Sequence, residues 1–377
     1  MTDVYLDPPT HHLAGDKLFD QAGNPYAGDD ILAPYVALRD HLERADFAVR
    51  TADAIPDRPD GRRKLLISFG TPDRLVSQTV DRYRALGRRP DITLSAFVAM
   101  ECPVVEPGMF QALPELASLF RRVLSWSDTT ALLPFTRDAV RVERFCWPQS
   151  FDAVHDALWS RTDRKFLLMM NANKLPRLTR DELYTTRLQA VEFFHAFGEI
   201  DLYGRNWDRA PTRVGKTATP YALRRLGSRW WEWRQRHWPD YLYAAATLAW
   251  RGAAASKSET MSQYRFALYF ENSVLKGWMT EKLFDCFFVG TVPVYWGAPD
   301  VTEWVPADSF IDMRQFRDFA ELRRFLHGLT ERDMAEYREA ARAYLNSSAF
   351  DPFRRRTFAA LLGRIVAEDA GSSGGST

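Results

Sequence analysis

The sequence predicts an α/β fold in two domains, each built around a parallel β-sheet. The chain has 377 residues, more than one hydrophobic core usually fills, so two domains of roughly 150–200 residues are expected. Short apolar strands alternate with helices in both halves, a pattern typical of parallel sheets. We therefore expect one domain over residues 1–160 and a second over 161–348, followed by a helix over 349–370 and a flexible tail over 371–377.

The N-terminal half is predicted to begin with little regular structure. Residues 1–60 are expected to form a loop with one amphipathic helix around Ala33–Ala45. The elements expected next are a strand over 64–70, a helix over 75–86 and a strand over 91–100. Glu101 follows the last of these strands directly. Because ligands bind at the carboxyl ends of strands in open α/β sheets, Glu101 is expected at a binding edge.

The C-terminal half shows a second set of alternating elements. They are strands over 165–173, 199–204, 264–272 and 291–297, with helices over 181–198 and 280–290. An insertion over 209–256 interrupts this set, and in it Trp230, Trp231, Trp233 and Trp238 are interleaved with arginines. We expect the insertion to be an amphipathic helical excursion with its aromatic side chains packed on the domain. Two alternatives remain open, an aromatic platform for a sugar acceptor and a peripheral contact with lipid headgroups.

Composition excludes several classes of protein. Lys and Arg number 50 and Asp and Glu 49, a formal charge of +1, so no field over the whole chain favours nucleic acid or anionic lipid. Three widely spaced cysteines without C-x-x-C spacing indicate a reducing compartment and neither a disulfide framework nor a zinc site. The acidic, Pro-containing start differs from a secretory signal, and the most apolar stretch is too short to span a bilayer. We expect a cytoplasmic protein, with peripheral association with the inner membrane left open.

The densest cluster of polar residues follows the strand that ends at Phe270. Glu271, Asn272 and Ser273 come directly after it. The next helix is expected to begin at Thr280, a favourable N-cap residue, and to hold Glu281 and Lys282 in its first turn. A helix N-terminus and a lysine at the carboxyl edge of a sheet favour binding of a diphosphate. Taken singly, Thr280 and Glu281 also fit helix capping, Lys282 a solvated surface charge and Asn272 a strand cap.

This arrangement resembles the signature of glycosyltransferase family ten, the α-1,3-fucosyltransferases, and in particular a soluble bacterial member. The family carries Y-[KR]-F-x-[LI]-x-F-E-N, then Y-V-T-E-K-[IL]-x-D, then a P-V-x-x-G strand and turn. The corresponding segments here are Tyr264–Asn272, Trp278–Asp285 and Pro293–Gly297. Trp278 stands where the family usually has Tyr, which keeps an aromatic face and removes a hydroxyl group. Weaker similarities place Arg187 and Glu101 at positions of the family's other motifs.

The resemblance implies a GT-B architecture, two Rossmann-like domains that face each other across a cleft. The first would bind the acceptor, an oligosaccharide or glycolipid, and the second would bind GDP-β-L-fucose. Arg187 and Lys282 would offset the charge of the departing diphosphate, and Glu271 or Glu281, with Glu281 preferred, would contact the sugar. Asn272, Trp278 and Thr280 would complete the donor site, and Glu101 would act as general base.

The function expected from this resemblance is the inverting transfer of L-fucose from GDP-fucose to a glycan hydroxyl group. The same fold with another GDP-sugar or acceptor is an alternative, and so is a glycan- or nucleotide-binding module without catalysis. The sequence contains no D-x-D triplet, so we predict no metal site and no required cofactor, while loosely held Mg²⁺ or Mn²⁺ is left open. The oligomeric state is not predicted.

Overall fold

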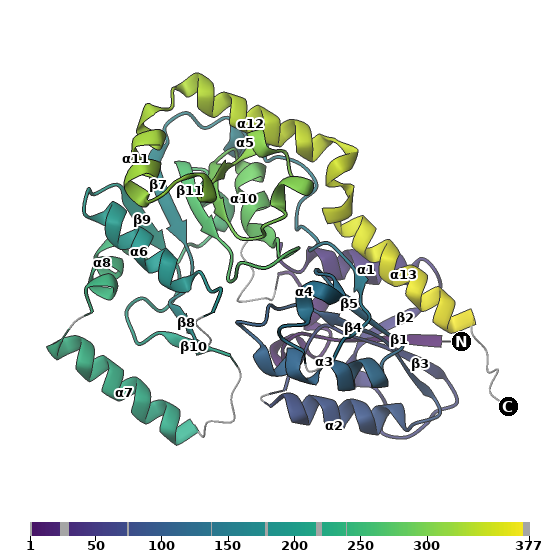
Figure 1. Cartoon of the computed structure of the whole chain (residues 1–377). Coiled ribbons are helices and arrows are strands. Elements are labelled where there is room, and N and C mark those ends of the chain that lie inside the picture. The colour runs from purple at the N-terminus through teal and green to yellow at the C-terminus, as the bar shows by residue number, and fades with distance from the viewer. Residues whose placement is uncertain are drawn as a thin grey trace. The chain divides into compact units, whose positions relative to one another are not determined.

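The structure is a computed structural model that describes residues 2–22, 30–73, 75–136, 138–177, 180–215, 221–238 and 240–371. The chain folds into two compact units (Figure 1). The N-terminal unit consists of Met1–Asp152 together with Asp351–Thr377, and the C-terminal unit of Ala153–Phe350. The boundary between the units thus lies after residue 152. The chain returns to the N-terminal unit after residue 350, and its last described helix belongs to that unit.

The N-terminal unit contains a six-stranded parallel sheet in the order β2-β1-β3-β4-β5-β6. Its strands are β1 (Thr2–Asp7), β2 (Ala48–Thr51), β3 (Arg63–Ser68), β4 (Ile92–Ala99), β5 (Arg122–Ser125) and β6 (Glu143–Arg144). Its helices of four residues or more are α1 (Ala33–Glu43), α2 (Val76–Gly87), α3 (Pro107–Leu119), α4 (Thr129–Leu132) and α13 (Arg355–Gly371). Four elements were predicted between residues 33 and 100. They are confirmed within a few residues as α1, β3, α2 and β4.

The prediction that residues 1–60 hold only one helix was wrong at β1 and β2. β1 lies inside the sheet, between β2 and β3. Its apolar part is only Val4–Leu6. Because Asp3 and Asp7 stand on either side, the sequence pattern here is typical of a loop and not of a buried strand. Asp7 is buried because Arg82 and the Tyr83 hydroxyl group both bond to its carboxylate, at 2.6 and 2.5 Å. The partners that permit this burial lie about 75 residues away in sequence, beyond the reach of a local pattern.

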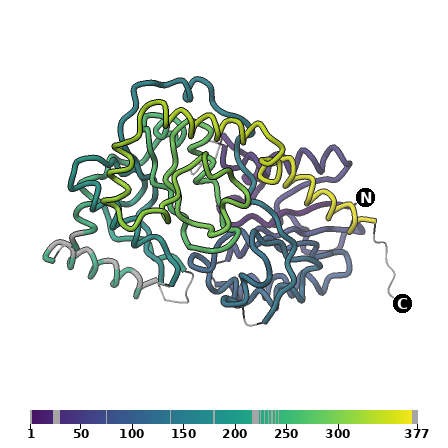
Figure 2. The backbone as a smooth tube through the Cα atoms, turned by 45° about the horizontal axis from the view of Figure 1, so that its top comes forward, coloured from purple at the N-terminus to yellow at the C-terminus, as the bar shows by residue number. Residues whose placement is uncertain are grey.

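α13 is the last described helix and packs against the N-terminal unit, beside α1 and the strands β3 and β4. Figure 2 shows this yellow helix alongside the purple and blue backbone of the first part of the chain. Phe358 of α13 is buried, with its ring 6.2 Å from Phe69 and 5.9 Å from Phe145. Asp369, also buried, accepts hydrogen bonds from Arg121 and Arg122. Apolar and ionic contacts therefore both hold the end of the chain to this unit.

The C-terminal unit contains a five-stranded parallel sheet in the order β13-β12-β11-β7-β9. Its strands are β7 (Lys165–Met170), β9 (Ile200–Tyr203), β11 (Tyr264–Phe270), β12 (Val292–Trp296) and β13 (Ile311–Asp312), and a separate parallel pair consists of β8 (Lys174–Pro176) and β10 (Thr212–Val214). The helices are α5 (Asp156–Trp159), α6 (Tyr184–His195), α7 (Tyr221–His237), α8 (Tyr241–Ala249), α9 (Lys257–Met261), α10 (Glu281–Val289), α11 (Phe319–Gly328) and α12 (Glu331–Asn346).

α10 forms as the sequence predicts because one of its faces is strongly apolar. Leu283, Phe284, Phe287 and Phe288 are all buried, and their spacing places them on one side of the helix. Gly290 ends the helix with φ of 69°, a left-handed conformation that glycine adopts without strain. This helix begins next to the end of β11, the central strand of the sheet, and its first turn therefore lies at the sheet's carboxyl edge.

The insertion is helical, as expected, but most of its tryptophans do not pack on the unit. α7 and α8 account for most of it. Trp230, Trp233 and Trp238 are exposed, and only Trp231 among these four is partly buried. In the part of the chain that the structure describes, no helix combines the length and the apolar character needed to cross a membrane.

We expect Phe358→Ala to lower the free energy of unfolding of the N-terminal unit by about 3–5 kcal/mol, since truncating a buried Phe loses its burial and leaves a cavity. Urea unfolding followed by circular dichroism measures this change. Ala360→Ser, an exposed position on the same helix, should shift stability by no more than about 0.5 kcal/mol. Equal stability of the Phe358 variant and the wild type would show that α13 contributes nothing to this unit.

Candidate active site

The candidate site lies where β11 ends, at the carboxyl edge of the C-terminal sheet. The backbone N–H group of Glu271 donates to the carbonyl of Trp296 at the end of β12, at 2.7 Å. Glu271 therefore extends β11 by one residue and lies next to the turn that follows β12. Its side chain is buried in the unit. Gly297 follows directly, and a Cβ atom there would lie 2.5 Å from Cγ of Glu271. The P-V-x-x-G turn thus needs glycine because the side chains of Glu271 and Tyr295 occupy the space.

The carboxylate of Glu271 is fully buried, with 0% of its side chain exposed. It accepts hydrogen bonds from the N–H group of Thr280 at 2.8 Å and from the Thr280 hydroxyl group at 2.9 and 3.0 Å. Nζ of Lys282 forms an ion pair with it at 3.1 Å. A buried charge is tolerated only when it is paired and hydrogen-bonded, and Glu271 meets both conditions through the start of α10.

Thr280 occupies the N-cap position of α10, as predicted, but its side chain does not cap the helix. Its hydroxyl group is directed to Glu271 and accepts a hydrogen bond from Nζ of Lys282 at 2.8 Å. The capping interpretation of this side chain was therefore wrong, because a buried carboxylate competes successfully with the backbone for the hydroxyl group. Thr280 connects Glu271 with Lys282.

Lys282 keeps its charge. Burial alone would lower its pKa, but attraction by Glu271 and Glu281 outweighs burial and raises the pKa above its ordinary value. Only 16% of its side chain is exposed. The site therefore contains a fixed ammonium group that remains protonated at neutral pH, with part of its surface accessible.

Arg187 on α6 brings a second cation to the same edge. Its Nε and Nη2 atoms donate to the carbonyl of Phe270 at 3.1 and 2.5 Å, and Nη2 also donates to Oδ1 of Asn272 at 3.1 Å. The residue is only 5% exposed. The charge of Arg187 opposes the protonation of Lys282, as expected for two cations that share one site. The structure thus brings together Arg187, Lys282 and Asn272.

Glu281 is the most accessible carboxylate of this cluster. Its side chain is 35% exposed, compared with 14% for Asp285 and 0% for Glu271. Burial would raise its pKa, but the charges of Lys282 and Lys257 outweigh burial and lower the pKa to about 2. Glu281 is therefore ionised at neutral pH. Such a group can stabilise a cation, and it is a weak proton acceptor.

Lys257 is a member of the cluster that the sequence does not reveal. It belongs to α9, forms an ion pair with Asp285 and lies 3.8 Å from Glu281. Burial of Asp285 raises the pKa of that carboxyl group to about 6, against the opposing effect of Lys257. Lys257 precedes β11 by seven residues, and no motif marks it. In the folded chain, acidic and basic side chains therefore alternate at the start of α10, in the order Asp285, Lys257, Glu281, Lys282 and Glu271.

Trp278 is buried in the unit, with 1% of its surface exposed. Its backbone N–H group bonds to Leu275 and its carbonyl lies 3.5 Å from the Tyr295 hydroxyl group. The same tight loop contains Gly277, whose φ of 77° requires glycine and whose N–H group donates to Asp300 at 2.8 Å. In this structure Trp278 shapes the loop, and its predicted contact with a ligand stays a prediction.

Glu101 belongs to the N-terminal unit and follows β4 by two residues, partly exposed at the carboxyl edge of that sheet. A second polar pair lies beyond the ends of β1 and β3 in the same unit. Nε2 of His11 is 2.9 Å from Asp73, and Asp73 also bonds to Thr79 and Arg82. No local sequence pattern marks this pair, because its members are 62 positions apart.

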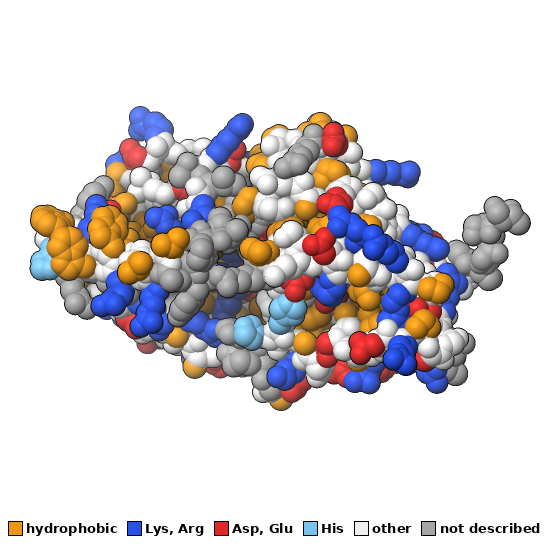
Figure 3. Space-filling model, turned by 90° about the horizontal axis from the view of Figure 1, so that it is seen from below, with side chains coloured by type: hydrophobic (Ala, Val, Ile, Leu, Met, Phe, Trp, Pro, Cys, Tyr) orange, Lys and Arg blue, Asp and Glu red, His pale blue; other side chains and the backbone are white. Residues whose placement is uncertain are grey.

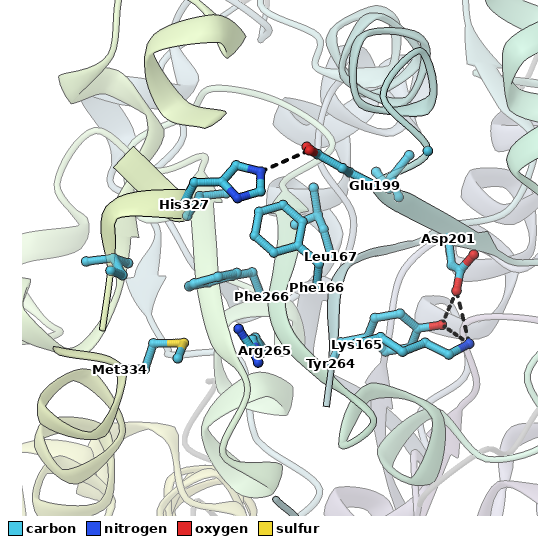
Figure 4. A pocket seen from close by; sticks show the side chains of 14 residues that line it. Lys165, Phe166, Leu167, Glu199, Asp201, Tyr264, Arg265, Phe266, His327 and Met334 are labelled. Carbon is cyan, nitrogen blue, oxygen red and sulfur yellow. Dashed lines mark hydrogen bonds and ion pairs between the residues drawn. The ribbon is translucent and has the colours of Figure 1, made fainter. Parts of the chain in front are cut away.

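A cavity of about 440 Å³ lies at the opposite end of the C-terminal sheet, beside the amino ends of β7, β9 and β11 (Figure 4). Several of the polar side chains that line it bond to each other. Lys165 and Tyr264 both contact Asp201, at 3.2 and 2.6 Å, and His327 lies 2.9 Å from Glu199. Ligands of such sheets bind at the carboxyl ends of the strands, so this cavity is separate from the candidate site. The described residues contain no group of three or more His, Cys, Asp or Glu side chains placed to hold a metal ion.

Residues 236–344 match the family described as glycosyltransferase family 10 (fucosyltransferase), C-terminal part. The chain is 42% identical over 66 residues to the α-(1,3)-fucosyltransferase FucT of Helicobacter pylori, covering 18% of this chain and 14% of the relative. It is 44% identical over 75 residues to human α-(1,3)-fucosyltransferase 7, covering 19% and 22%. The resemblance predicted from the motifs is confirmed. The alignments span less than a quarter of either relative.

The fold is shared with solved glycosyltransferase structures. A crystal structure of an α1,3-fucosyltransferase aligns with a TM-score of 0.50 at 14% identity, covering 98% of this chain and 91% of that one. A glycosyltransferase from Rickettsia africae aligns with a TM-score of 0.51 at 10% identity, covering 99% of both chains. The predicted fold class, α/β with GT-B architecture, is confirmed by these similarities.

We expect Glu281→Gln to change the pH dependence of stability. The pKa of Glu281 in the folded chain is below the ordinary 4.5, so its ionised form stabilises the fold above about pH 4.5, and this contribution disappears as the pH falls toward 2. Urea unfolding from pH 7 to pH 3 should therefore show the variant less stable than the wild type at pH 7, and this deficit in stability should shrink to roughly half or less of that size at pH 3. The control variant Glu336→Gln replaces an exposed carboxylate, and its free energy of unfolding should differ little from that of the wild type at every pH. If the difference in stability between Glu281→Gln and the wild type did not vary with pH, the lowered pKa of Glu281 would be contradicted.

Proposed function

We propose that this chain transfers L-fucose from GDP-β-L-fucose to a hydroxyl group of an acceptor glycan, with inversion at the anomeric carbon. The observation that carries the proposal is the ammonium group of Lys282, which Glu271 and Thr280 fix at 3.1 and 2.8 Å at the carboxyl edge of a parallel sheet. It lies within the segment that matches the fucosyltransferase family. The identity of the sugar rests on that family similarity.

The diphosphate of the donor is the group that the two cations suit best. As the bond to the sugar breaks, negative charge develops on GDP, and a preorganised cation stabilises it. Lys282 is accessible enough to contact a phosphate oxygen directly. Arg187 is more deeply buried, and it supports the site by its charge and by holding Asn272. This division of roles needs no metal ion, whereas added Mg²⁺ or Mn²⁺ would compete with Lys282 for the same oxygens.

Glu281 is suited to face the sugar. The transition state of glycosyl transfer carries positive charge on the ring, and Glu281 is the accessible, ionised carboxylate of the cluster. Its low pKa excludes it as an efficient proton acceptor at neutral pH. Glu271, which is fully buried, acts through Lys282 and not on the sugar. These observations favour Glu281 over Glu271, the choice that the sequence also favoured.

The reaction proposed is a single displacement. The acceptor oxygen forms a bond to C1 of fucose, the bond from C1 to the β-phosphate oxygen breaks, and GDP leaves with the electron pair. The acceptor's proton passes to a general base, for which we propose Glu101 because it lies at the carboxyl edge of the N-terminal sheet. The His11–Asp73 pair beyond the same edge is the competing candidate. One base is sufficient for inversion.

A first experiment tests the donor. The protein is incubated with GDP-fucose, GDP-mannose and UDP-sugars without acceptor, and slow release of the nucleotide is measured. We expect release from GDP-fucose in preference to the others. Preference for GDP-mannose would support the alternative of another GDP-sugar, and binding without release or transfer would support a non-catalytic module.

We expect Lys282→Met to weaken GDP binding by roughly tenfold to a hundredfold, the equivalent of one charge-assisted hydrogen bond. Isothermal titration calorimetry measures the affinity. Lys282→Arg keeps the charge opposite Glu271 and should retain more binding than Lys282→Met. Unchanged affinity in the Met variant would remove Lys282 from the nucleotide site.

We expect Glu101→Gln to leave GDP affinity near that of the wild type and to lower the transfer rate by roughly 10²–10⁴-fold, the usual contribution of a general base. His11→Ala is the matched comparison, and it should retain most of the activity. The reverse result, with Glu101→Gln active and His11→Ala inactive, would assign the proton transfer to the His11–Asp73 pair.

A further inference from the structure

The outer face of α7 carries a continuous row of large apolar side chains. Leu223, Leu226, Trp230 and Trp233 recur at intervals of three and four residues, which places them on one side of the helix. They are 58%, 61%, 61% and 49% exposed. Figure 3 shows large orange side chains gathered over this part of the C-terminal unit, with blue arginine side chains beside them. Exposed apolar side chains scattered singly are ordinary, but a row of this size marks an interaction surface.

The other face of α7 is the one that attaches it to the unit. Trp231 is partly buried, and its ring meets the ring of Tyr243 on α8 edge-on, with 5.1 Å between the centroids. Tyr243 in turn lies 6.5 Å from the buried Trp207. Among the side chains of α7 that the structure describes, Trp231 thus makes an aromatic contact with the unit, while its neighbours Trp230 and Trp233 are exposed. At its C-terminal end, Trp233 and Trp238 form an exposed edge-to-face pair, 5.4 Å apart.

α7 is also strongly basic. Between Tyr221 and His237 the sequence contains five arginines and one acidic residue, Glu232. Arg225 and Arg229 are exposed and are neighbours of the apolar row along the helix. This local excess of positive charge contrasts with the chain as a whole, whose formal charge is +1. The charge is thus concentrated on the same helix that exposes the tryptophans.

We propose that α7 binds the surface of a membrane that contains anionic phospholipids. A helix with a basic polar face and Trp and Leu on its apolar face lies in the plane of the interface. Tryptophan favours the headgroup level, where its ring is apolar and its N–H group is hydrated. Its arginines would contact the phosphate groups of anionic lipids, each adding to the attraction. Five arginines in 17 residues are incompatible with crossing the bilayer.

Charge argues against a second copy of this chain as the occupant. Two such helices packed through their apolar rows would place Arg225 and Arg229 of both copies beside the contact, a repulsive arrangement. Nucleic acid would satisfy the arginines but would leave Leu223 and Leu226 without an apolar partner. An anionic bilayer satisfies both parts of the surface. This inference does not depend on the transfer reaction, because it concerns binding to lipid alone.

The test is co-sedimentation of the full chain with vesicles. Vesicles of phosphatidylcholine with 30% phosphatidylserine are compared with vesicles of phosphatidylcholine alone. We expect binding to the anionic vesicles and roughly tenfold weaker binding to the neutral ones, with release at high salt. Trp230→Ser with Trp233→Ser should lower binding to anionic vesicles by tenfold or more. The matched control, Leu133→Ser with Phe197→Ser, removes two exposed apolar side chains elsewhere and should bind like the wild type.

The charge is tested separately. Arg225→Gln with Arg229→Gln should weaken binding to anionic vesicles by tenfold or more, whereas Arg317→Gln with Arg332→Gln, two exposed arginines outside α7, should not. Failure of the wild type to bind anionic vesicles, or undiminished binding by the double tryptophan variant, would overturn the proposal. So would sedimentation velocity that shows a dimer dissociated by the tryptophan substitutions, or tight binding to RNA in preference to vesicles.

Discussion

The carboxylate of Glu271 is completely buried, and the structure around it follows from the need to compensate its charge. An unpaired buried charge costs about 3–5 kcal/mol, so the start of α10 must present the Thr280 N–H and hydroxyl groups and the Lys282 ammonium group to it. Gly297 must lack a side chain because a Cβ atom there would collide with the side chains of Glu271 and Tyr295. The cation proposed to bind the diphosphate is thereby fixed in position, with its charge maintained by Glu271.

Glu271 also explains why three separate motifs occur together. The E-N pair that ends β11, the T-E-K start of α10 and the P-V-x-x-G turn after β12 all meet at this carboxylate. Each motif taken singly fits ordinary structure, such as a strand end, a helix cap or a turn. Together they form one ionic site at the edge of a parallel sheet, and the spacing between them carries the resemblance to glycosyltransferase family 10.

Local patterns predicted what local residues determine. The apolar face of α10 and its glycine stop, and the strands β3, β4 and β11, follow from the periodicity of neighbouring side chains. The patterns failed where distant partners decide the structure. β1 depends on Arg82 and Tyr83 to bury Asp7, Lys257 joins the site from α9 through Asp285, and His11 meets Asp73 across 62 positions. The tryptophans of α7 were expected to pack because large apolar side chains usually do. Their exposure indicates an interaction surface that the pattern alone could not distinguish from a core.

The most direct test of this account is the affinity for GDP of the Glu271→Gln variant, measured by calorimetry alongside its thermal stability. Glu271 has no exposed surface and cannot touch the nucleotide in this structure, so any effect must pass through the groups that it holds, Lys282 and Thr280. The account predicts that the amide, which accepts a hydrogen bond but carries no charge, releases Lys282 from its fixed position and weakens GDP binding by tenfold or more in a protein that still folds. A folded Glu271→Gln variant that binds GDP as tightly as the wild type would contradict it.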